Sequence, residues 1–314
     1  MKKIPVIVVL GPTASGKTAL SIELAKVYNG EIVSADSMQI YKGMDIATAK
    51  PTKEEMSNVP HHLIGFVDPD KRFSVAEYVE TAKKVIFDVS SRGKMPIICG
   101  GTGLYINSLI DNIKFDDMSE DFKLREKYQR IAKENGNHYL WEKLRSVDEK
   151  AALGIHENNV TRVIRALEVY ELSGKTISEA KDISRAEPSP FDTYFIGLNF
   201  SDRQMLYEKI NKRVDKMIEI GLIEETKQAY SRNCSMKTAH QAIGYKELIP
   251  YFEGESCLEA CIDKIKQETR RYAKRQLTWF RRDTRINWIN CDEFGSIKKI
   301  SEKIQKDIAK SCFL

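Results

Sequence analysis

The sequence predicts an α/β fold in which a parallel sheet is interrupted by an inserted all-helical domain. In the first third of the chain, apolar strand-like runs alternate with helix-like periodicity, a pattern typical of parallel strands joined by helical crossovers. A charged stretch without strand signals then occupies residues 116–186 and ends near a Pro-rich break at residues 187–190. We therefore expect a core formed by residues 1–115 and 187–314.

Apolar runs and periodicity place the individual elements. We expect strands at residues 4–10, 31–35, 63–67 and 95–99 and helices at residues 19–28 and 75–90. After the insertion we expect strands at residues 194–198 and 287–290, and helices at residues 202–220, 222–232, 245–252 and 256–282.

Composition indicates a globular protein of 314 residues, with 42% hydrophobic and 30% charged residues. No apolar run reaches the roughly 18–20 residues that a membrane-spanning helix needs. The six cysteines show no CxxC pair and no zinc-type spacing. We expect reduced thiols, a cytoplasmic location, no membrane contact and a monomer.

Basic residues concentrate near the end of the chain. Residues 267–285 hold seven Lys or Arg against two acidic residues, which accounts for the whole net charge of +5. Such a cluster is typical of proteins that bind a phosphate backbone, although a solvated helix face gives the same pattern. A smaller basic pair, Arg162 and Arg165, lies three residues apart in the insertion.

A phosphate-binding loop of the form GxxxxGK[ST] lies between the first strand and the first helix. Its residues are Gly11, Pro12, Thr13, Ala14, Ser15, Gly16, Lys17 and Thr18. The glycines allow backbone N–H groups to surround phosphate oxygens, the lysine binds a terminal phosphate, and the Thr18 hydroxyl is expected to bind Mg²⁺. The motif predicts a P-loop NTPase-like core that binds a diphosphate or triphosphate, and leaves the reaction open.

Residues that follow the other strands are further candidates, because ligands of such sheets lie beyond the carboxyl ends of the strands. Asp36 is a candidate general base, metal ligand or cap. Thr102, in a Gly-rich turn, offers a hydroxyl, and Asp68 is either a Mg²⁺-supporting carboxylate or part of a turn. Arg213 lies along the apolar stripe of its helix and needs either a carboxylate or a bound phosphate as partner.

The sequence closely resembles bacterial tRNA dimethylallyltransferases, also called tRNA isopentenyltransferases. The resemblance spans nearly the whole chain in order. It is carried by GPTASGKT (11–18), DSMQIYKGMDIATAKP (36–51), GGTGLY (100–105), TRVIRALE (161–168), SGK (173–175), QAIGYK (241–246) and KRQLTWFR (274–281).

The resemblance implies transfer of a dimethylallyl group from dimethylallyl diphosphate to the exocyclic amine of the adenosine 3′ to a tRNA anticodon. The phosphate loop, with Mg²⁺ and Arg213, would hold the leaving diphosphate. Asp36 matches the general base of the family, and Thr102 matches a residue at the adenosine site.

The same resemblance implies contacts with the tRNA anticodon stem-loop. The matching residues are Asp36, Ser37, Met38, Gln39, Thr102, Arg125, Thr161, Arg162, Val163, Ile164, Arg165, Gln241, Gly244, Tyr245, Lys246, Lys274, Arg275, Gln276, Thr278 and Arg281. Some relatives carry arginine in place of Gln241, so no charge contact is expected at that position.

Two other functions share the phosphate loop. An ATP-dependent small-molecule kinase uses the same loop and sheet but gives no reason for a basic C-terminal helix. A nucleic-acid-dependent NTPase needs a carboxylate such as Asp68 on Mg²⁺. Turnover of dimethylallyl diphosphate without ATP hydrolysis discriminates against both.

Overall fold

The computed structural model describes residues 3–115, 121–184, 187–231, 241–311 and 313. The chain forms two compact units, one made of Met1–Ile110 and Pro190–Leu314, the other of Asp111–Ser189. None of the helices in the described ranges is both long enough and apolar enough to cross a membrane.

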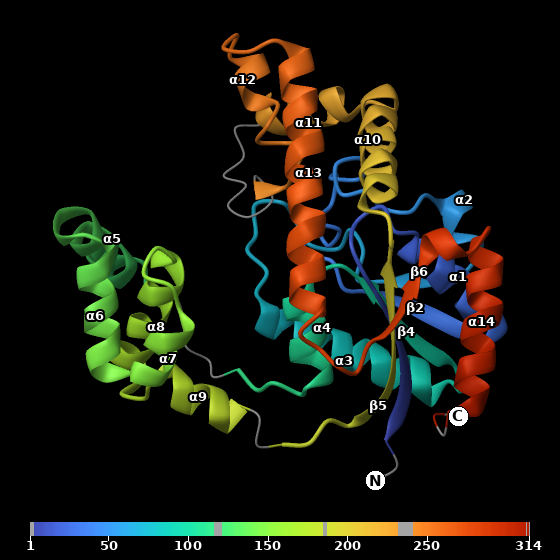
Figure 1. Cartoon of the computed structure of the whole chain (residues 1–314), viewed down its shortest axis with the longest axis horizontal. Coiled ribbons are helices and arrows are strands. Elements are labelled where there is room, and N and C mark those ends of the chain that lie inside the picture. Colours follow the sequence, from blue (N-terminus) through green and yellow to red (C-terminus); the bar gives the residue numbers. More distant parts are fainter. Residues whose placement is uncertain (1–2, 116–120, 185–186, 232–240, 312, 314) are drawn as a thin grey trace. The chain divides into compact units, whose positions relative to one another are not determined.

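The first unit is built on a parallel six-stranded sheet with the order β3-β2-β4-β1-β5-β6 (Figure 1). The strands are β1 (Ile4–Leu10), β2 (Gly30–Ser34), β3 (His61–His62), β4 (Met95–Gly100), β5 (Phe191–Asn199) and β6 (Asn287–Asn290). The central strand β1 is an apolar run, as expected for a parallel strand covered on both faces. Both faces of β1 are indeed buried.

Alternation along β1 divides the core into two layers. Val6 and Val8 pack with α3 (Val75–Ser91) and α4 (Gly103–Ile110), whereas Ile7 and Val9 pack with α1 (Lys17–Val27) and α14 (Ile297–Lys310). The period of two in a strand sends successive side chains to opposite faces, so one sequence run supplies both layers.

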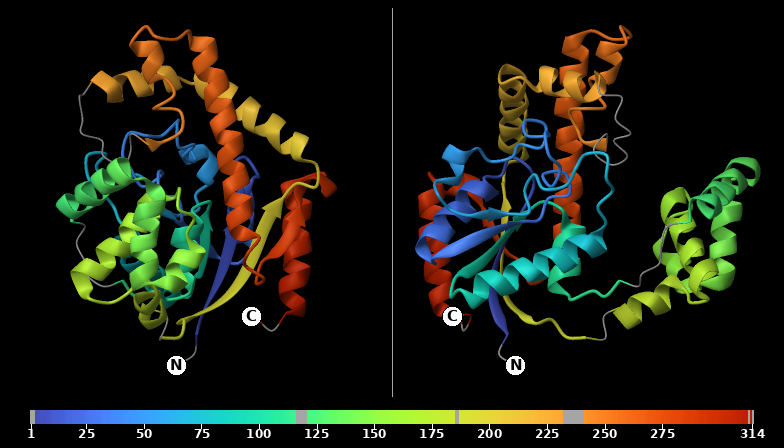
Figure 2. Two further views of the ribbon diagram at one scale, coloured as in Figure 1. Left: turned by 60° about the vertical axis from the view of Figure 1, so that its left-hand side comes forward. Right: turned by 180° about the vertical axis from the view of Figure 1, so that it is seen from behind.

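The remaining helices of this unit include a four-residue helix that buries no residue, and the others contribute to smaller apolar clusters. They are α2 (Lys53–Met56), α10 (Arg203–Glu219), α11 (Leu222–Ser231), α12 (Ile249–Phe252) and α13 (Leu258–Phe280). Figure 2 shows α13, in orange, extending well beyond the sheet. Its C-terminal half packs through Ala273 and Leu277 against Leu206 and Ile210 of α10.

The second unit is all-helical in its described residues. It contains α5 (Phe122–Asn135), α6 (Asn137–Val147), α7 (Glu149–Gly154), α8 (Val160–Ser173) and α9 (Ile177–Ser184). Its core includes Tyr128, Leu140, Leu144, Val163 and Leu167.

Most predicted elements are present, and two are wrong in extent. The expected strand at residues 63–67 is replaced by a bend, because Leu63 and Gly65 have φ values of 62° and 59°, and only His61–His62 pairs with β2. Of the helix expected at residues 245–252, only Ile249–Phe252 is helical. Helices α2, α4 and α14 were not predicted, and Arg232, the last residue of one expected helix, lies outside the described residues.

A buried carboxylate anchors the amino-terminal end of β2. Glu31 is 2% exposed and accepts two hydrogen bonds from Arg92, at 2.6 and 2.7 Å, and one contact each from His62 and Lys94. The bonds from Arg92 lower the pKa of Glu31 well below its ordinary value, against the raising effect of burial. The carboxylate therefore stabilises the fold above the ordinary Glu pKa, and this contribution is lost as pH falls.

We predict that Glu31→Gln lowers the free energy of unfolding at pH 7 by about 2 kcal/mol, since it removes the charge opposite Arg92 and Lys94. Urea denaturation at a series of pH values measures this. The difference from the unmodified protein should shrink as pH falls below about 4.5. Glu80→Gln, at an exposed pair with Lys84, is the control and should change stability little. A difference that stays constant with pH would contradict the role of the Glu31 charge.

Candidate active site

The phosphate loop joins β1 to α1 in a conformation that requires glycine. Gly11 and Gly16 have φ values of 145° and 91°, in the region that side chains rarely adopt. A Cβ atom at Gly11 would also lie 2.7 Å from the carbonyl oxygen of Leu198. The loop leads into the N-terminus of α1, which has no side-chain cap, and uncapped N–H groups at a helix start attract anions.

Lys17 extends back along this loop, with its Nζ donating a 2.7 Å hydrogen bond to the carbonyl oxygen of Pro12. Burial lowers the pKa of Lys17 to about 8, and the nearby Arg213 adds to this, while the charge of Asp36 acts in the opposite direction. The ammonium group is thus costly to keep charged, and a bound anion would relieve that cost.

Arg213 reaches the same loop from α10. Its Nη1 donates a 3.2 Å hydrogen bond to the hydroxyl of Thr13. Burial lowers the pKa of Arg213, although Asp36 and Glu55 oppose this effect. No carboxylate in the described part of the chain lies within ion-pair distance of the guanidinium, so a bound phosphate is the better of the two partners that the sequence left open.

Asp36 follows β2, and its charge raises the pKa of both cations against the effect of burial. Its Oδ1 accepts hydrogen bonds from the backbone N–H groups of Met38 at 2.9 Å and Gln39 at 3.3 Å. Asp36 is therefore a cap, and because both of these bonds use Oδ1, Oδ2 is left to serve a second role. The side chain of Gln39 is occupied by the carbonyl oxygens of Thr48 and Ala49, so it holds its own loop together.

Thr102 is bonded to the segment that carries Asp36. Its Oγ1 accepts a 3.0 Å hydrogen bond from the backbone N–H of Ser37, and its own N–H donates to the carbonyl oxygen of Ala35 at 3.1 Å. The turns after β2 and β4 are thereby held together at the carboxyl ends of neighbouring strands.

Helix α13 packs directly on the glycine-rich turn after β4. Cβ atoms at Gly101 and Gly103 would lie 2.1 Å from the Gln276 amide and 2.2 Å from the Trp279 ring. Gln276 is buried and bonds to the loop backbone. The side chain of Gln276 therefore has a structural role that was not predicted, and contact of this position with RNA stays a prediction. The sequence signal was its position beside Leu277 on the apolar side of the helix.

The opposite face of α13 is exposed and basic at Lys274 and Arg275 and carries Thr278, with Arg281 directly after the last helical residue. The guanidinium of Arg275 lies 5.7 Å from the centroid of the Tyr272 ring. Arg285, the last residue of the basic segment 267–285, lies beyond the helix and pairs with Asp283.

The segment 241–246 contributes unequally to the surface. Gln241 and Lys246 are exposed, whereas Tyr245 is 2% exposed and its hydroxyl bonds to Glu225 at 3.2 Å. The N–H of Gly244 donates to the Glu247 carboxylate. The side chain of Tyr245 is thus structural, and RNA contact along this segment stays a prediction.

The insertion, taken by itself, exposes Thr161 and Arg162 but buries Val163 and Ile164 in its core. The side chains of the latter two are therefore structural, and RNA contact along this segment stays a prediction. Arg125 and Arg165 both bond to Glu168, a carboxylate with no exposed surface. Burial raises the pKa of Glu168, but the bonds from the two arginines outweigh it and keep this carboxyl ionised.

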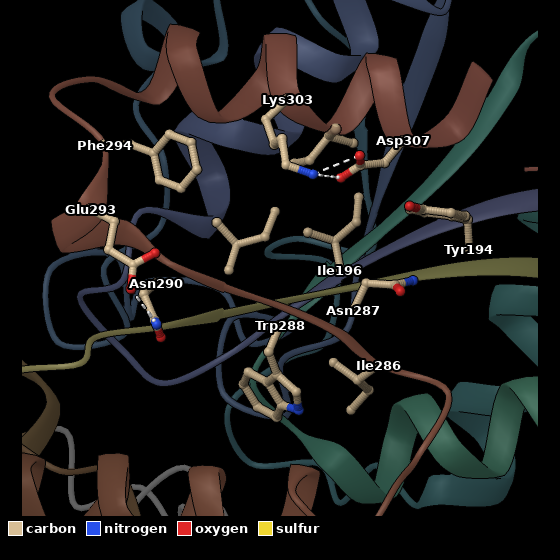
Figure 3. Close-up of a pocket in the computed structure, with 12 residues that line it drawn as sticks. Tyr194, Ile196, Ile286, Asn287, Trp288, Asn290, Glu293, Phe294, Lys303 and Asp307 are labelled. Carbon is tan, nitrogen blue, oxygen red and sulfur yellow. Dashed lines mark hydrogen bonds and ion pairs between the residues drawn. The ribbon is translucent and has the colours of Figure 1, made fainter. Parts of the chain in front are cut away.

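Two other polar features of the first unit are already paired within the chain. A pocket of about 450 Å³ between β6 and α14 contains the ion pair Lys303–Asp307 and a hydrogen bond between Asn290 and Glu293 (Figure 3). None of the predicted site residues lines it. Asp68 pairs with Lys42 at 2.9 Å and Lys71 at 3.6 Å on the surface, which favours the turn over a metal-supporting role.

Comparison with known proteins decides the family. A family model described as IPP transferase matches residues 39–283. The chain belongs to the IPP transferase family. It is 50% identical over 311 residues to the tRNA dimethylallyltransferase of Thermoanaerobacter sp. (strain X514), covering 98% of each chain. It is 52% identical over 305 residues to that of Acetivibrio thermocellus, covering 97% of each.

Two solved structures confirm the predicted fold of this IPP transferase. The tRNA isopentenylpyrophosphate transferase of Bacillus halodurans is 44% identical, with a TM-score of 0.74 over 98% of this chain and 96% of that one. A eukaryotic dimethylallyltransferase acting on tRNA is 32% identical, with a TM-score of 0.79 over 97% and 80%. The resemblance found in the sequence is confirmed.

The lowered pKa of Lys17 predicts how anion binding depends on pH. A bound diphosphate favours the charged lysine, so the contribution of Lys17 to affinity is complete below pH 8 and declines as pH rises above it. We expect the ratio of inorganic diphosphate affinities between the unmodified protein and Lys17→Met to fall by up to about tenfold per pH unit above 8. Calorimetric titration measures the ratio, in which ionisation of the ligand itself cancels. A ratio independent of pH would contradict this.

Proposed function

We propose that this IPP transferase moves a dimethylallyl group from dimethylallyl diphosphate to the exocyclic amine of the adenosine 3′ to the anticodon of tRNA, releasing diphosphate. The observation that carries the proposal is the placement of two buried cations, Lys17 and Arg213, beside the carboxylate Asp36 at one end of the sheet. Relatives named tRNA dimethylallyltransferase, about half identical over the full chain, support it.

The cations and the phosphate loop suit a diphosphate leaving group. As the allylic C–O bond breaks, negative charge grows on the diphosphate, and Lys17, Arg213 and the loop N–H groups neutralise it. These donors lie in a desolvated site, where such interactions are strong.

A magnesium ion fits this donor set. No cluster of three His, Cys, Asp or Glu side chains suited to a metal occurs among the described residues, and Mg²⁺ is commonly bound by one or two protein oxygens together with substrate phosphates and water. The Thr18 hydroxyl, at the start of α1, would be the protein ligand. When bound, the ion would supply further positive charge to the diphosphate oxygens.

Asp36 is suited to receive the amine proton. An aromatic amine is a weak nucleophile, and removal of its proton as the new C–N bond forms lowers the barrier. The Oδ1 bonds to Met38 and Gln39 fix the carboxylate, so that Oδ2 can accept the proton. Thr102, bonded to Ser37, lies where it can help to place the adenosine.

The exposed residues at the C-terminal end of α13 suit the RNA backbone, because cations clustered on one element bind phosphates. The target adenosine must leave its stack to reach a site at the sheet edge, and anticodon-loop bases are already partly unstacked. Gln241 and Lys246 add exposed polar groups in the same unit, as Arg162 and Thr161 do in the insertion.

A kinase is the second function compatible with the phosphate loop, but nothing in the comparisons favours it. An NTPase that uses Asp68 is disfavoured by the surface ion pairs of this residue. To test the proposal, the protein is incubated with unmodified tRNA, Mg²⁺ and either dimethylallyl diphosphate or ATP, and the digested nucleosides are analysed by mass. An isopentenyl increment on one adenosine with the diphosphate alone supports transfer. ATP consumption without the increment contradicts it.

We predict that Asp36→Asn reduces the rate of transfer by about 10²-fold or more, since general base catalysis contributes on this scale. The amide retains an acceptor for Met38 and Gln39, so RNA binding should change little, whereas Asp36→Ala removes the cap as well. Single-turnover kinetics and RNA titration measure the two effects. A near-normal rate for Asp36→Asn would remove Asp36 from the role of base.

We predict that Lys274→Ala combined with Arg275→Ala weakens tRNA binding and flattens its dependence on salt. Each lost phosphate contact should reduce the slope of log affinity against log salt by about 0.7–0.9. Lys298→Ala combined with Lys299→Ala makes the same charge change at exposed positions of α14 and should leave the slope unchanged. Equal slopes for all three proteins would contradict an RNA role for this face.

A further inference from the structure

Gln276 is a buried amide on the side of α13 that faces the sheet. It is 5% exposed. Its Oε1 accepts a 2.8 Å hydrogen bond from the backbone N–H of Thr13, and its Nε2 donates a 3.0 Å hydrogen bond to the carbonyl oxygen of Gly101. Because the amide oxygen only accepts and the amide nitrogen only donates, the two bonds fix its orientation.

These two bonds join the two halves of the candidate site. Thr13 belongs to the phosphate loop, and its hydroxyl is also bonded to Arg213. Gly101 directly precedes Thr102, which bonds to the backbone on either side of Asp36. The Gln276 amide therefore spans from the groups that face the diphosphate to the groups that hold the carboxylate.

The turn after β4 packs tightly against α13 at this connection. A Cβ atom at Gly101 would lie 2.1 Å from Nε2 of Gln276. Gly103, two residues on, is covered equally closely by Trp279, one turn further along α13. The hydroxyl of Tyr272 lies beside Thr102 and Gln276. Burial raises the pKa of Tyr272, and side-chain hydrogen bonds with Thr102 and Gln276 partly offset this effect. The position of α13 thus fixes that of the turn after β4.

We propose that Gln276 is a positioning residue that sets the spacing between the leaving diphosphate and the carboxylate that receives the amine proton. This rests on the proposed function. Both polar groups of the Gln276 side chain are engaged by the protein backbone. Gln276 acts by holding Thr13 and Gly101 at one distance, and since small misplacements of reacting groups can reduce a rate by about 10²-fold, its loss should affect the chemical step more than binding.

The test uses the full chain and the variant Gln276→Met, which keeps the length of the side chain and removes both hydrogen bonds. We expect the single-turnover rate at saturating dimethylallyl diphosphate and RNA to fall about tenfold or more. The dissociation constants for anticodon stem-loop RNA and for Mg²⁺ with inorganic diphosphate should each change by less than about threefold. Gln267→Met is the matched control on the same helix, because the amide of Gln267 bonds to Lys264 of that helix, and its rate should be unchanged.

A second variant separates the two bonds. Gln276→Glu keeps an acceptor for Thr13 but places an acceptor against the carbonyl oxygen of Gly101, so its rate should also fall. An unchanged rate in Gln276→Met overturns the proposal. A loss of rate with matching losses of both affinities also overturns it, since that result identifies a general structural role. If the unmodified protein binds both ligands but transfers no dimethylallyl group, the proposed function itself fails.

Discussion

The parallel pairing of β1 with β4 and β5 is the constraint on which the rest of the site depends. It brings the carboxyl ends of adjacent strands to one edge. The phosphate loop follows β1, Asp36 follows β2, and the glycine-rich turn follows β4. Arg213 arrives on α10, the helix after β5. Residues far apart in sequence therefore meet at the edge of the sheet where the parallel strands end.

Buried charged side chains have different partners in the candidate site and elsewhere in the chain. The buried carboxylates Glu31 and Glu168 are each surrounded by cationic side chains, so their charges are compensated within the fold. Lys17 and Arg213 are buried with hydrogen bonds to a carbonyl and a hydroxyl instead. Buried charge without a directly paired counterion is expensive, and the charge of Asp36 offsets only part of the effect of burial on the two cations. Under the proposed function, the leaving diphosphate would supply further negative charge.

The sequence was sufficient to predict the sheet, the insertion and the phosphate loop, because apolar runs, helical periodicity and a long motif are local signals. The inward orientation of Arg213 also followed from periodicity. The sequence was insufficient where tertiary packing determines the local structure. The apolar run at residues 63–67 became a bend, because Leu63 and Gly65 have positive φ values and only His61–His62 pairs with β2.

Motif membership likewise could not separate surface from core. Val163, Tyr245 and Gln276 share motifs with exposed neighbours, yet the fold buries them. The two hydrogen bonds of the Gln276 side chain depend on the contact between α13 and a turn at Gly101, 175 residues earlier. No local sequence pattern encodes such a contact. Long-range packing therefore determines which residues of each motif are buried and structural.

The proposed function requires that the diphosphate departs and the adenosine amine accepts the dimethylallyl group at one site. The most direct measurement follows inorganic diphosphate release and isopentenyladenosine formation together in a single turnover with dimethylallyl diphosphate. The account predicts equal amounts and equal rates of the two products, with no diphosphate released when RNA is left out. Rapid diphosphate release without RNA, or release that runs ahead of adenosine modification, would contradict it.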